Sequence, residues 1–171
     1  VIDISFNNNS VKNGKYYNSG RTATVTIREH NFSSAGTNVK TTAEIAEGAV
    51  DAPSAGSWSS VGDNNSASVP FTKDGNYTMQ VNYTDLAGNV ALEKTVSEFV
   101  VDTTKPQITI GGVENKKAYN GDVAPSITYH DINYDNTSAG ISIVGYKHKN
   151  SENLKGTLSD NAFGGSYICN N

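Results

Sequence analysis

The sequence predicts an all-β fold of the sandwich type, and three observations support this class. Between residues 77 and 83, Tyr77, Met79, Val81 and Tyr83 alternate with polar residues, so that one face of a strand can lie against a core. Strand-favouring Thr, Val, Ile and Tyr are plentiful, and the turn formers Gly, Asn, Asp and Ser separate the short apolar runs. Few stretches could form a helix.

The expected strands of the first hundred residues follow one another at short intervals. Apolar alternation occurs at residues 2–6, 23–27, 39–45 and 67–71. The strand at 77–83 follows a turn that contains Asp74 and Gly75, and a hairpin at residues 85–89 leads to a last strand from Val90 to Val101. About seven such strands form one sandwich. With 171 residues, the chain has room for one full domain and part of a second.

Internal repetition indicates a second module. The dipeptide Tyr17-Asn18 recurs as Tyr119-Asn120, and Phe32 corresponds to Tyr134. Because nothing after residue 168 corresponds to residues 77–101, the second module is expected to be truncated before its last two strands. The expected organisation is a sandwich at 1–102, a short linker at 103–106, which Pro106 stiffens, and the incomplete module at 107–171.

An incomplete module would leave strand edges and apolar side chains uncovered. The residues expected to be exposed in this way are Ile141, Ile143, Phe163 and Ile168. An uncovered edge invites pairing with another chain, so a strand-exchange dimer is a further expectation.

Two sets of residues resemble known β-modules. The spacing of Asp74, Gly75, Tyr77 and Met79 resembles the tyrosine-corner region of immunoglobulin-like domains. The segments 13–18 (NGKYYN), 29–32 (EHNF), 83–89 (YTDLAGN) and 101–106 (VDTTKP) together resemble the tandem bacterial immunoglobulin-like modules of large surface proteins from Gram-positive bacteria. In that family, most modules are spacers that hold an adhesin or an enzyme away from the cell wall, and some bind ligands.

The resemblance implies immunoglobulin-like β-sandwich modules in tandem, the second incomplete, in a protein outside the cell, at its surface. The implied function is a non-catalytic structural spacer or adhesion module whose partners are neighbouring modules of the same longer chain. Tyr77, Asp85, Gly88 and Asn89 are the expected structural residues. The alternative function is ligand binding, with a glycan or a host protein as ligand.

Composition excludes some classes of function. The net charge is −4, and the 13 basic residues form no stripe that could neutralise phosphates, so nucleic acid is not an expected partner. No window is apolar enough for a membrane span. The only cysteine, Cys169, cannot form a disulfide within the chain, and it is expected to be an interior strand residue.

Oxygen-bearing residues follow the second strand of the second module. Asp131, Asn133 and Asp135 could wrap a calcium ion, and Asp102, directly before the linker, could share it, because calcium takes six to eight oxygen ligands. The alternative is that these side chains are turn formers that hydrogen-bond their own backbone. No cofactor other than calcium is expected.

Aromatic residues provide the candidate ligand site. Trp58 and Tyr16 could stack a sugar or anchor a protein ligand, and Trp58 could equally fill the space between two sheets. Catalysis has little support, since the three histidines, His30, His130 and His148, have no metal-ligand spacing and no activated nucleophile beside them.

A covalent cross-link within the first module is a further alternative. An isopeptide bond between Lys12 or Lys15 and Asn89 would need an apolar core around the lysine, but these residues lie in polar turns.

Overall fold

The computed structural model describes residues 1–142, 144–147, 150–153 and 155–170, and these residues form an all-β protein. The one helical segment among them is the short 3-10 helix η1 (Ser34–Gly36). The chain divides into two compact units, Val1–Thr104 (unit 1) and Lys105–Asn171 (unit 2). The expected linker, 103–106, spans this division. Each unit is described by itself.

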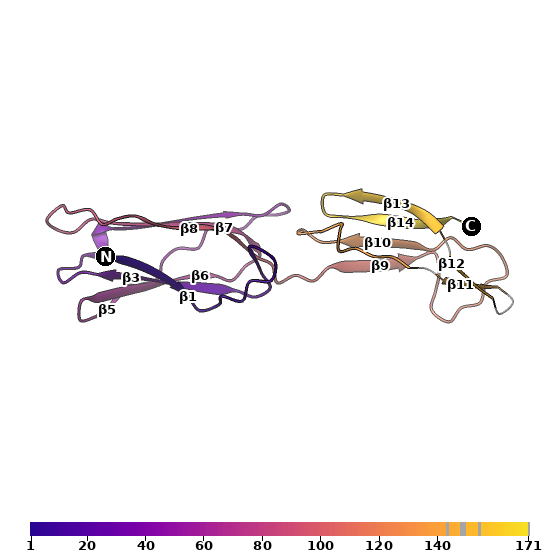
Figure 1. The fold of residues 1–171 in the computed structure, drawn as a ribbon, viewed down its shortest axis with the longest axis horizontal. Helices are drawn as coiled ribbons and strands as arrows, with labels where there is room; N and C mark the ends of the chain where they lie inside the picture. Colours follow the sequence, from indigo (N-terminus) through magenta and orange to yellow (C-terminus); the bar gives the residue numbers. More distant parts are fainter. Residues whose placement is uncertain (143, 148–149, 154, 171) are drawn as a thin grey trace. The chain divides into compact units, whose positions relative to one another are not determined.

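Unit 1 contains two four-stranded sheets (Figure 1). In the first sheet the order is β1-β3-β6-β5, and all neighbours are antiparallel. Its strands are β1 (Ile2–Phe6), β3 (Arg21–Arg28), β5 (Ser59–Val61) and β6 (Asn64–Phe71).

The second sheet of unit 1 has the order β2-β8-β7-β4. Its strands are β2 (Tyr16–Tyr17), β4 (Thr37–Glu44), β7 (Gly75–Tyr83) and β8 (Lys94–Val101). Both of the long pairings are antiparallel, whereas β2 runs parallel to β8.

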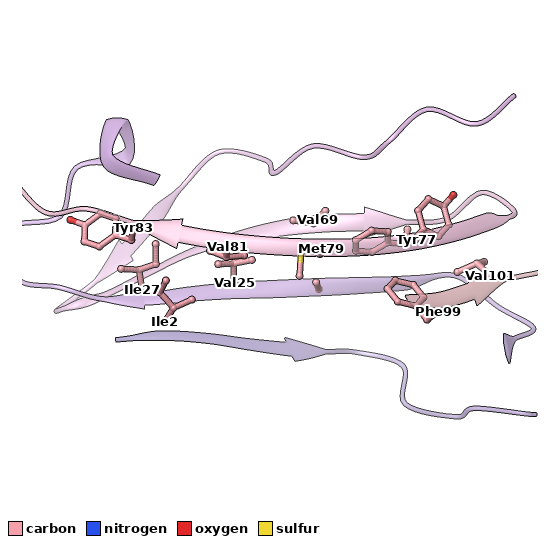
Figure 2. Packing of buried hydrophobic residues seen from close by; sticks show 12 residues of the cluster. Ile2, Val25, Ile27, Val69, Tyr77, Met79, Val81, Tyr83, Phe99 and Val101 are labelled. Atoms are coloured by element: carbon pink, nitrogen blue, oxygen red, sulfur yellow. The ribbon is translucent and has the colours of Figure 1, made fainter. Parts of the chain in front are cut away.

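The two sheets share one apolar core, an arrangement consistent with a β-sandwich. Figure 2 shows side chains of β1, β3 and β6 facing those of β7 and β8. The expected inward face of β7 is confirmed, since Tyr77, Met79, Val81 and Tyr83 are all buried. The aromatic ring of Phe71 in β6 lies 5.1 Å from that of Tyr77, between ring centroids, and so joins one sheet to the other.

The last strand of unit 1 differs from the expectation. Val90 forms only an isolated bridge with Thr84, and β8 begins at Lys94. The pairing register also shifts, because Tyr77 lies opposite Phe99 whereas Met79 lies opposite Val96. This β-bulge breaks the alternation of β8, which therefore cannot be read with a period of two.

Unit 2 contains a four-stranded antiparallel sheet and a separate hairpin (Figure 1). The sheet has the order β13-β14-β10-β9, with β9 (Gln107–Gly111), β10 (Ser126–His130), β13 (Lys155–Asn161) and β14 (Gly164–Asn170). The hairpin consists of β11 (Val144–Lys147) and β12 (Asn150–Asn153).

Candidate functional site

Tyr77 lies at the start of β7 and closes the turn before it. Its hydroxyl donates a hydrogen bond to the carbonyl oxygen of Lys73 at 2.9 Å, while the ring is 1% exposed and packs against Phe71. Burial, with a smaller contribution from the charge of Asp74, raises the pKa of the hydroxyl. A tyrosine that bonds back to the backbone a few residues upstream is the arrangement the sequence suggested for this corner.

Asp74 binds the segment that leaves β8. Its carboxylate accepts hydrogen bonds from the backbone N–H and the hydroxyl of Thr103 and from the same two groups of Thr104, at 2.5 to 3.1 Å. Partial burial opposes ionisation of this carboxyl, but the four hydrogen bonds outweigh it and hold the pKa of Asp74 below its usual value. Asp74 therefore fixes the end of unit 1 to the turn before β7.

The loop from Asp85 to Asn89 is held by its own side chains. Asp85 Oδ1 accepts from the backbone N–H groups of Ala87 and Asn89, and Asp85 Oδ2 accepts from the side-chain amide of Asn89. Gly88 has a φ of +87°, a conformation that favours glycine. The hydrogen bonds, above all that from the Asn89 side chain, lower the pKa of Asp85. All three expected structural residues of this loop thus take part in a turn.

The candidate calcium ligands make turns of the same kind. Asp131 Oδ1 accepts from the backbone N–H of Asn133, and Asp135 accepts from the N–H and hydroxyl of Thr137 and from the hydroxyl of Ser138. The hydrogen bonds from these hydroxyl groups lower the pKa of Asp135. Asp102 accepts from the N–H of Thr104. In the part of the chain that the structure describes, no three His, Cys, Asp or Glu side chains are grouped to hold a metal ion.

The loop that begins at Asp131 lies at one end of the unit 2 sheet. His130, the residue before it, is paired with Gln107, so the loop lies at the end of the sheet where β9 begins. Asp102 belongs to unit 1, and a calcium ion shared between Asp102 and this loop remains a prediction.

Trp58 is a half-buried residue of the sandwich. Its ring centroid lies 5.1 Å from that of Phe32, which in turn stacks on Tyr83 at 5.7 Å. All three residues pack at the same edge of the core. Tyr16 is half-buried too, and it is paired in register with Val100 of β8. Trp58 therefore contributes to the packing of the core, Tyr16 is held by strand pairing, and each keeps part of its surface accessible.

Sequence reasoning missed the most unusual polar group of unit 1, the guanidinium of Arg21. Arg21 is only 5% exposed, and its guanidinium carbon lies 3.8 Å from the ring centroid of Phe6, 3.9 Å from that of Tyr17 and 4.6 Å from that of Phe99. Nε donates to the carbonyl oxygen of Asn8 at 2.8 Å. Burial lowers the pKa of this guanidinium, which stays charged at neutral pH. The sequence does indicate that Arg21 faces inward, because it precedes Ala23 by two residues and alternate residues of a strand point to the same face.

An isopeptide bond between Lys15 and Asn89 does not fit this fold. Lys15 lies beside the end of β8, where its carbonyl accepts from the N–H of Val100 and its amino group pairs with Glu98. Asn89 lies in the loop before β8 and bonds to Asp85. Since the length of β8 separates them, a bond between Lys15 and Asn89 is ruled out.

The structure describes two of the three histidines. His30 Nδ1 lies 2.9 Å from Asp63 Oδ1 at an exposed site, and this hydrogen bond raises the pKa of His30. His130 is a strand residue of β10, and His148 lies outside the described residues.

Comparison with known proteins gives no relative. No family model, no curated protein and no solved structure matches this chain. Among the described residues, no helix has the length and apolar character needed to cross a membrane.

Proposed function

We propose that this chain is a structural spacer and adhesion segment of a bacterial cell-surface or secreted protein, built from immunoglobulin-like modules in tandem. The observation that carries the proposal is the Tyr77 corner: a buried tyrosine, in a sandwich of two four-stranded sheets, donates to the carbonyl of Lys73. This hydrogen bond is typical of immunoglobulin-like sandwiches. The resemblance of the segments 13–18, 29–32, 83–89 and 101–106 to tandem surface modules supports the same proposal.

The use of the polar side chains also favours a structural role. Asp85, Asp131 and Asp135 accept hydrogen bonds from residues of their own turns, and Asp74 accepts hydrogen bonds from Thr103 and Thr104. Such bonds stabilise local turns and leave few free acceptors for a substrate. In this proposal the chain acts through its length and folding stability, with neighbouring modules of a longer chain as partners.

A copy-number experiment tests the spacer role. One, two and four copies of the chain are placed between a cell-wall anchor and a fluorescent reporter, and the distance of the reporter from the wall is measured by two-colour localisation microscopy. We expect the distance to rise in proportion to the copy number. Gly/Ser linkers of equal length are the control, because a flexible coil extends only with about the square root of its length. Equal distances for the two series would refute the spacer role.

Ligand binding by the accessible parts of Trp58 and Tyr16 is the alternative proposal. Trp58→Ala and Tyr16→Ala are compared with the unchanged chain on glycan arrays and in host-protein binding screens. Binding that either substitution abolishes, while unit 1 remains folded, would favour this alternative. Blank arrays for all three proteins would favour the spacer.

Calcium is tested separately, by melting in the presence of calcium and of a chelator. A rise in melting temperature that Asp131→Ala with Asp135→Ala removes would establish a calcium site. Identical curves would leave these residues as turn formers.

A further inference from the structure

The sheet of unit 2 repeats the strand order of one sheet of unit 1. In unit 1 the order is β1-β3-β6-β5, and in unit 2 it is β9-β10-β14-β13, with every neighbour antiparallel in both (Figure 1). The four strands therefore correspond in chain order, β9 to β1, β10 to β3, β13 to β5 and β14 to β6.

The pairing registers show which faces correspond. In unit 1, Val25 is paired with Ile4 on one side and with Ala67 on the other. In unit 2, Ile127 is paired in the same way with Ile110 and Tyr167. Directly paired residues point to the same face of a sheet. The face of unit 2 that carries Ile110, Ile127 and Tyr167 therefore matches the core face of unit 1. Its large apolar residues, here called the unit 2 apolar face, are Ile108, Ile110, Ile127, Tyr129, Leu158 and Tyr167.

In unit 1 the corresponding face is covered by the second sheet. Ile2, paired with Ile27, is 2% exposed, and Ile27 is fully buried. Across the core lie Tyr77, Met79 and Val81 of β7, all at most 1% exposed (Figure 2). This burial is what stabilises a sheet whose side chains alternate between apolar and polar.

In unit 2 the outer strands β9 and β13 leave their large apolar residues of this face exposed, whereas Ile127, Tyr129 and Tyr167 on the two central strands are half-buried. Cys169, on the same side of β14 as Tyr167, is buried. Ile108, at the place of Ile2, is 69% exposed, while Ile110 is 63% and Leu158 is 53% exposed. The opposite face of the same sheet carries mostly small polar residues, such as Thr109, Thr128 and Ser166, together with Ile168. The alternation is thus that of a sheet with one covered and one solvated face. Asp160 also lies on the unit 2 apolar face, where it accepts a hydrogen bond from Tyr129.

An aromatic contact beside the sheet differs between the two units and indicates which kind of partner would fit the unit 2 apolar face. In unit 1, Phe32 follows β3 and stacks on Tyr83 at the end of β7. In unit 2 its counterpart in the repeat, Tyr134, follows β10 and packs at 5.4 Å against Tyr129 of the sheet itself. The described part of unit 2 provides no strand at the position of β7. The ring of Tyr134 therefore packs on Tyr129 of the unit 2 apolar face instead of on such a strand.

We propose that the unit 2 apolar face is a docking surface for a two-stranded antiparallel segment with the side-chain pattern of β7 and β8. The covering strand presents large apolar or aromatic side chains at every second position, as Tyr77, Met79, Val81 and Tyr83 do in β7. Its neighbour adds an aromatic side chain like that of Phe99. A second copy of this chain is the less favoured occupant, because its own β7 and β8 are already buried in unit 1. This inference rests on strand order and exposure and is independent of the proposed function.

The test uses the full chain and a labelled peptide with the sequence of residues 74–102, measured by fluorescence anisotropy. We expect saturable binding that Ile110→Asp weakens at least tenfold. Thr109→Asp, one position away on the opposite face of β9, is the matched control and leaves binding unchanged. Equal binding by all three proteins would overturn the proposal, and absence of binding would overturn it together with failure of the fused segment described next. A peptide whose alternate apolar residues are replaced by Ser controls for nonspecific association.

Two further measurements keep the test decisive, since an isolated hairpin is only marginally stable in water. First, a copy of residues 72–104 is appended to residue 171, and binding of an apolar fluorescent dye is compared with that of the unchanged chain. We expect the appended segment to reduce dye binding and Ile110→Asp to reverse this; failure in both this assay and the peptide assay overturns the proposal. Second, sedimentation of the unchanged chain is expected to show a monomer, whereas a dimer that Ile110→Asp dissociates would assign the face to a second copy instead.

Discussion

Two tyrosines of β7 provide a matched test of hydrogen bonding in the core of unit 1. Tyr77 is 1% exposed and its hydroxyl donates to Lys73, whereas Tyr83 is 3% exposed and its hydroxyl has no hydrogen-bond partner among the described residues. Replacing each with Phe keeps the ring and removes only the hydroxyl. The two substitutions therefore differ in one respect, the presence of an acceptor.

The expected free-energy changes have opposite signs. Tyr77→Phe removes a hydrogen bond with a net contribution of about 1 kcal/mol and leaves the carbonyl of Lys73 without its donor. Tyr83→Phe removes a buried unpaired hydroxyl, a group that costs about 1–3 kcal/mol, so the variant should be as stable as the unchanged chain or more so. For a unit of about 100 residues, 1 kcal/mol corresponds to a shift in melting temperature of about 4–8 °C.

Trp58 makes the measurement specific to unit 1, because it is the only tryptophan of the chain and it packs on Phe32. Its fluorescence is followed during urea and thermal unfolding of the full chain and both variants. We expect a lower midpoint for Tyr77→Phe and an equal or higher midpoint for Tyr83→Phe. Equal losses in the two variants would refute the reasoning, since they would show that the hydroxyl of Tyr83 is paired or that the bond to Lys73 contributes nothing.

Three other changes to unit 1 can be followed with the same tryptophan signal. Arg21→Lys keeps the charge but loses the planar group that contacts three rings, so the free energy of unfolding should fall by roughly 1–3 kcal/mol; a change under about 0.5 kcal/mol would contradict this. Asp74→Asn should lower the free energy of unfolding at neutral pH. Because the pKa of Asp74 in the folded chain lies below its usual 3.8, the stability difference between the unchanged chain and the variant should be complete above pH 3.8. It should disappear as the pH falls through the folded pKa. A difference in melting temperature that persisted at the lowest pH would argue against the carboxylate as its cause. Gly36→Ala should destabilise unit 1 by more than about 1 kcal/mol, since an added Cβ would lie 2.0 Å from the carbonyl oxygen of Thr84. Gly56→Ala, where the nearest atom lies at 3.6 Å, is the control and should be close to neutral.

The regular strands of unit 1 could be predicted because each carries its own alternation. The inward residues of β3 and β7 recur at every second position, and the structure buries Val25, Ile27, Met79 and Val81 as expected. A period of two depends only on neighbours along the chain, so it is visible without knowledge of the rest of the fold.

Features that depend on distant segments could not be predicted in this way. β2 has two residues in a polar stretch, and it forms because β8 lies beside it. β5 has three exposed residues and is defined only by its pairing with β6. The burial of Arg21 requires rings contributed by three other parts of unit 1, so its environment cannot be inferred from its own neighbours.

Among the candidate site residues, too, contacts between sequence neighbours were predicted and contacts between distant segments were not. Asp85, Gly88 and Asn89 are close in sequence and form the expected turn. The Asp74 carboxylate binds Thr103 and Thr104, which follow it by a whole hairpin, and this contact was not foreseen. In unit 2 the exposure of Ile168 is confirmed, whereas Ile108, Ile110 and Leu158 are exposed apolar residues that were not expected. Of the expected set, Ile168 is 51% exposed on the opposite face, Ile141 and Phe163 are half-buried, and Ile143 lies outside the described residues.

The parallel pairing of β2 with β8 has a consequence for unit 1 under tension. β2 is the second strand of the unit and β8 is the last, and the N–H of Val100 donates to Lys15 while the N–H of Asp102 donates to Tyr17, each at 2.9 Å. When the two ends of unit 1 are pulled apart, strands that run in the same direction slide along each other. We expect the hydrogen bonds between them to be stretched together in shear rather than opened one at a time, so that this patch of a few residues adds to the resistance of unit 1 to a pulling force.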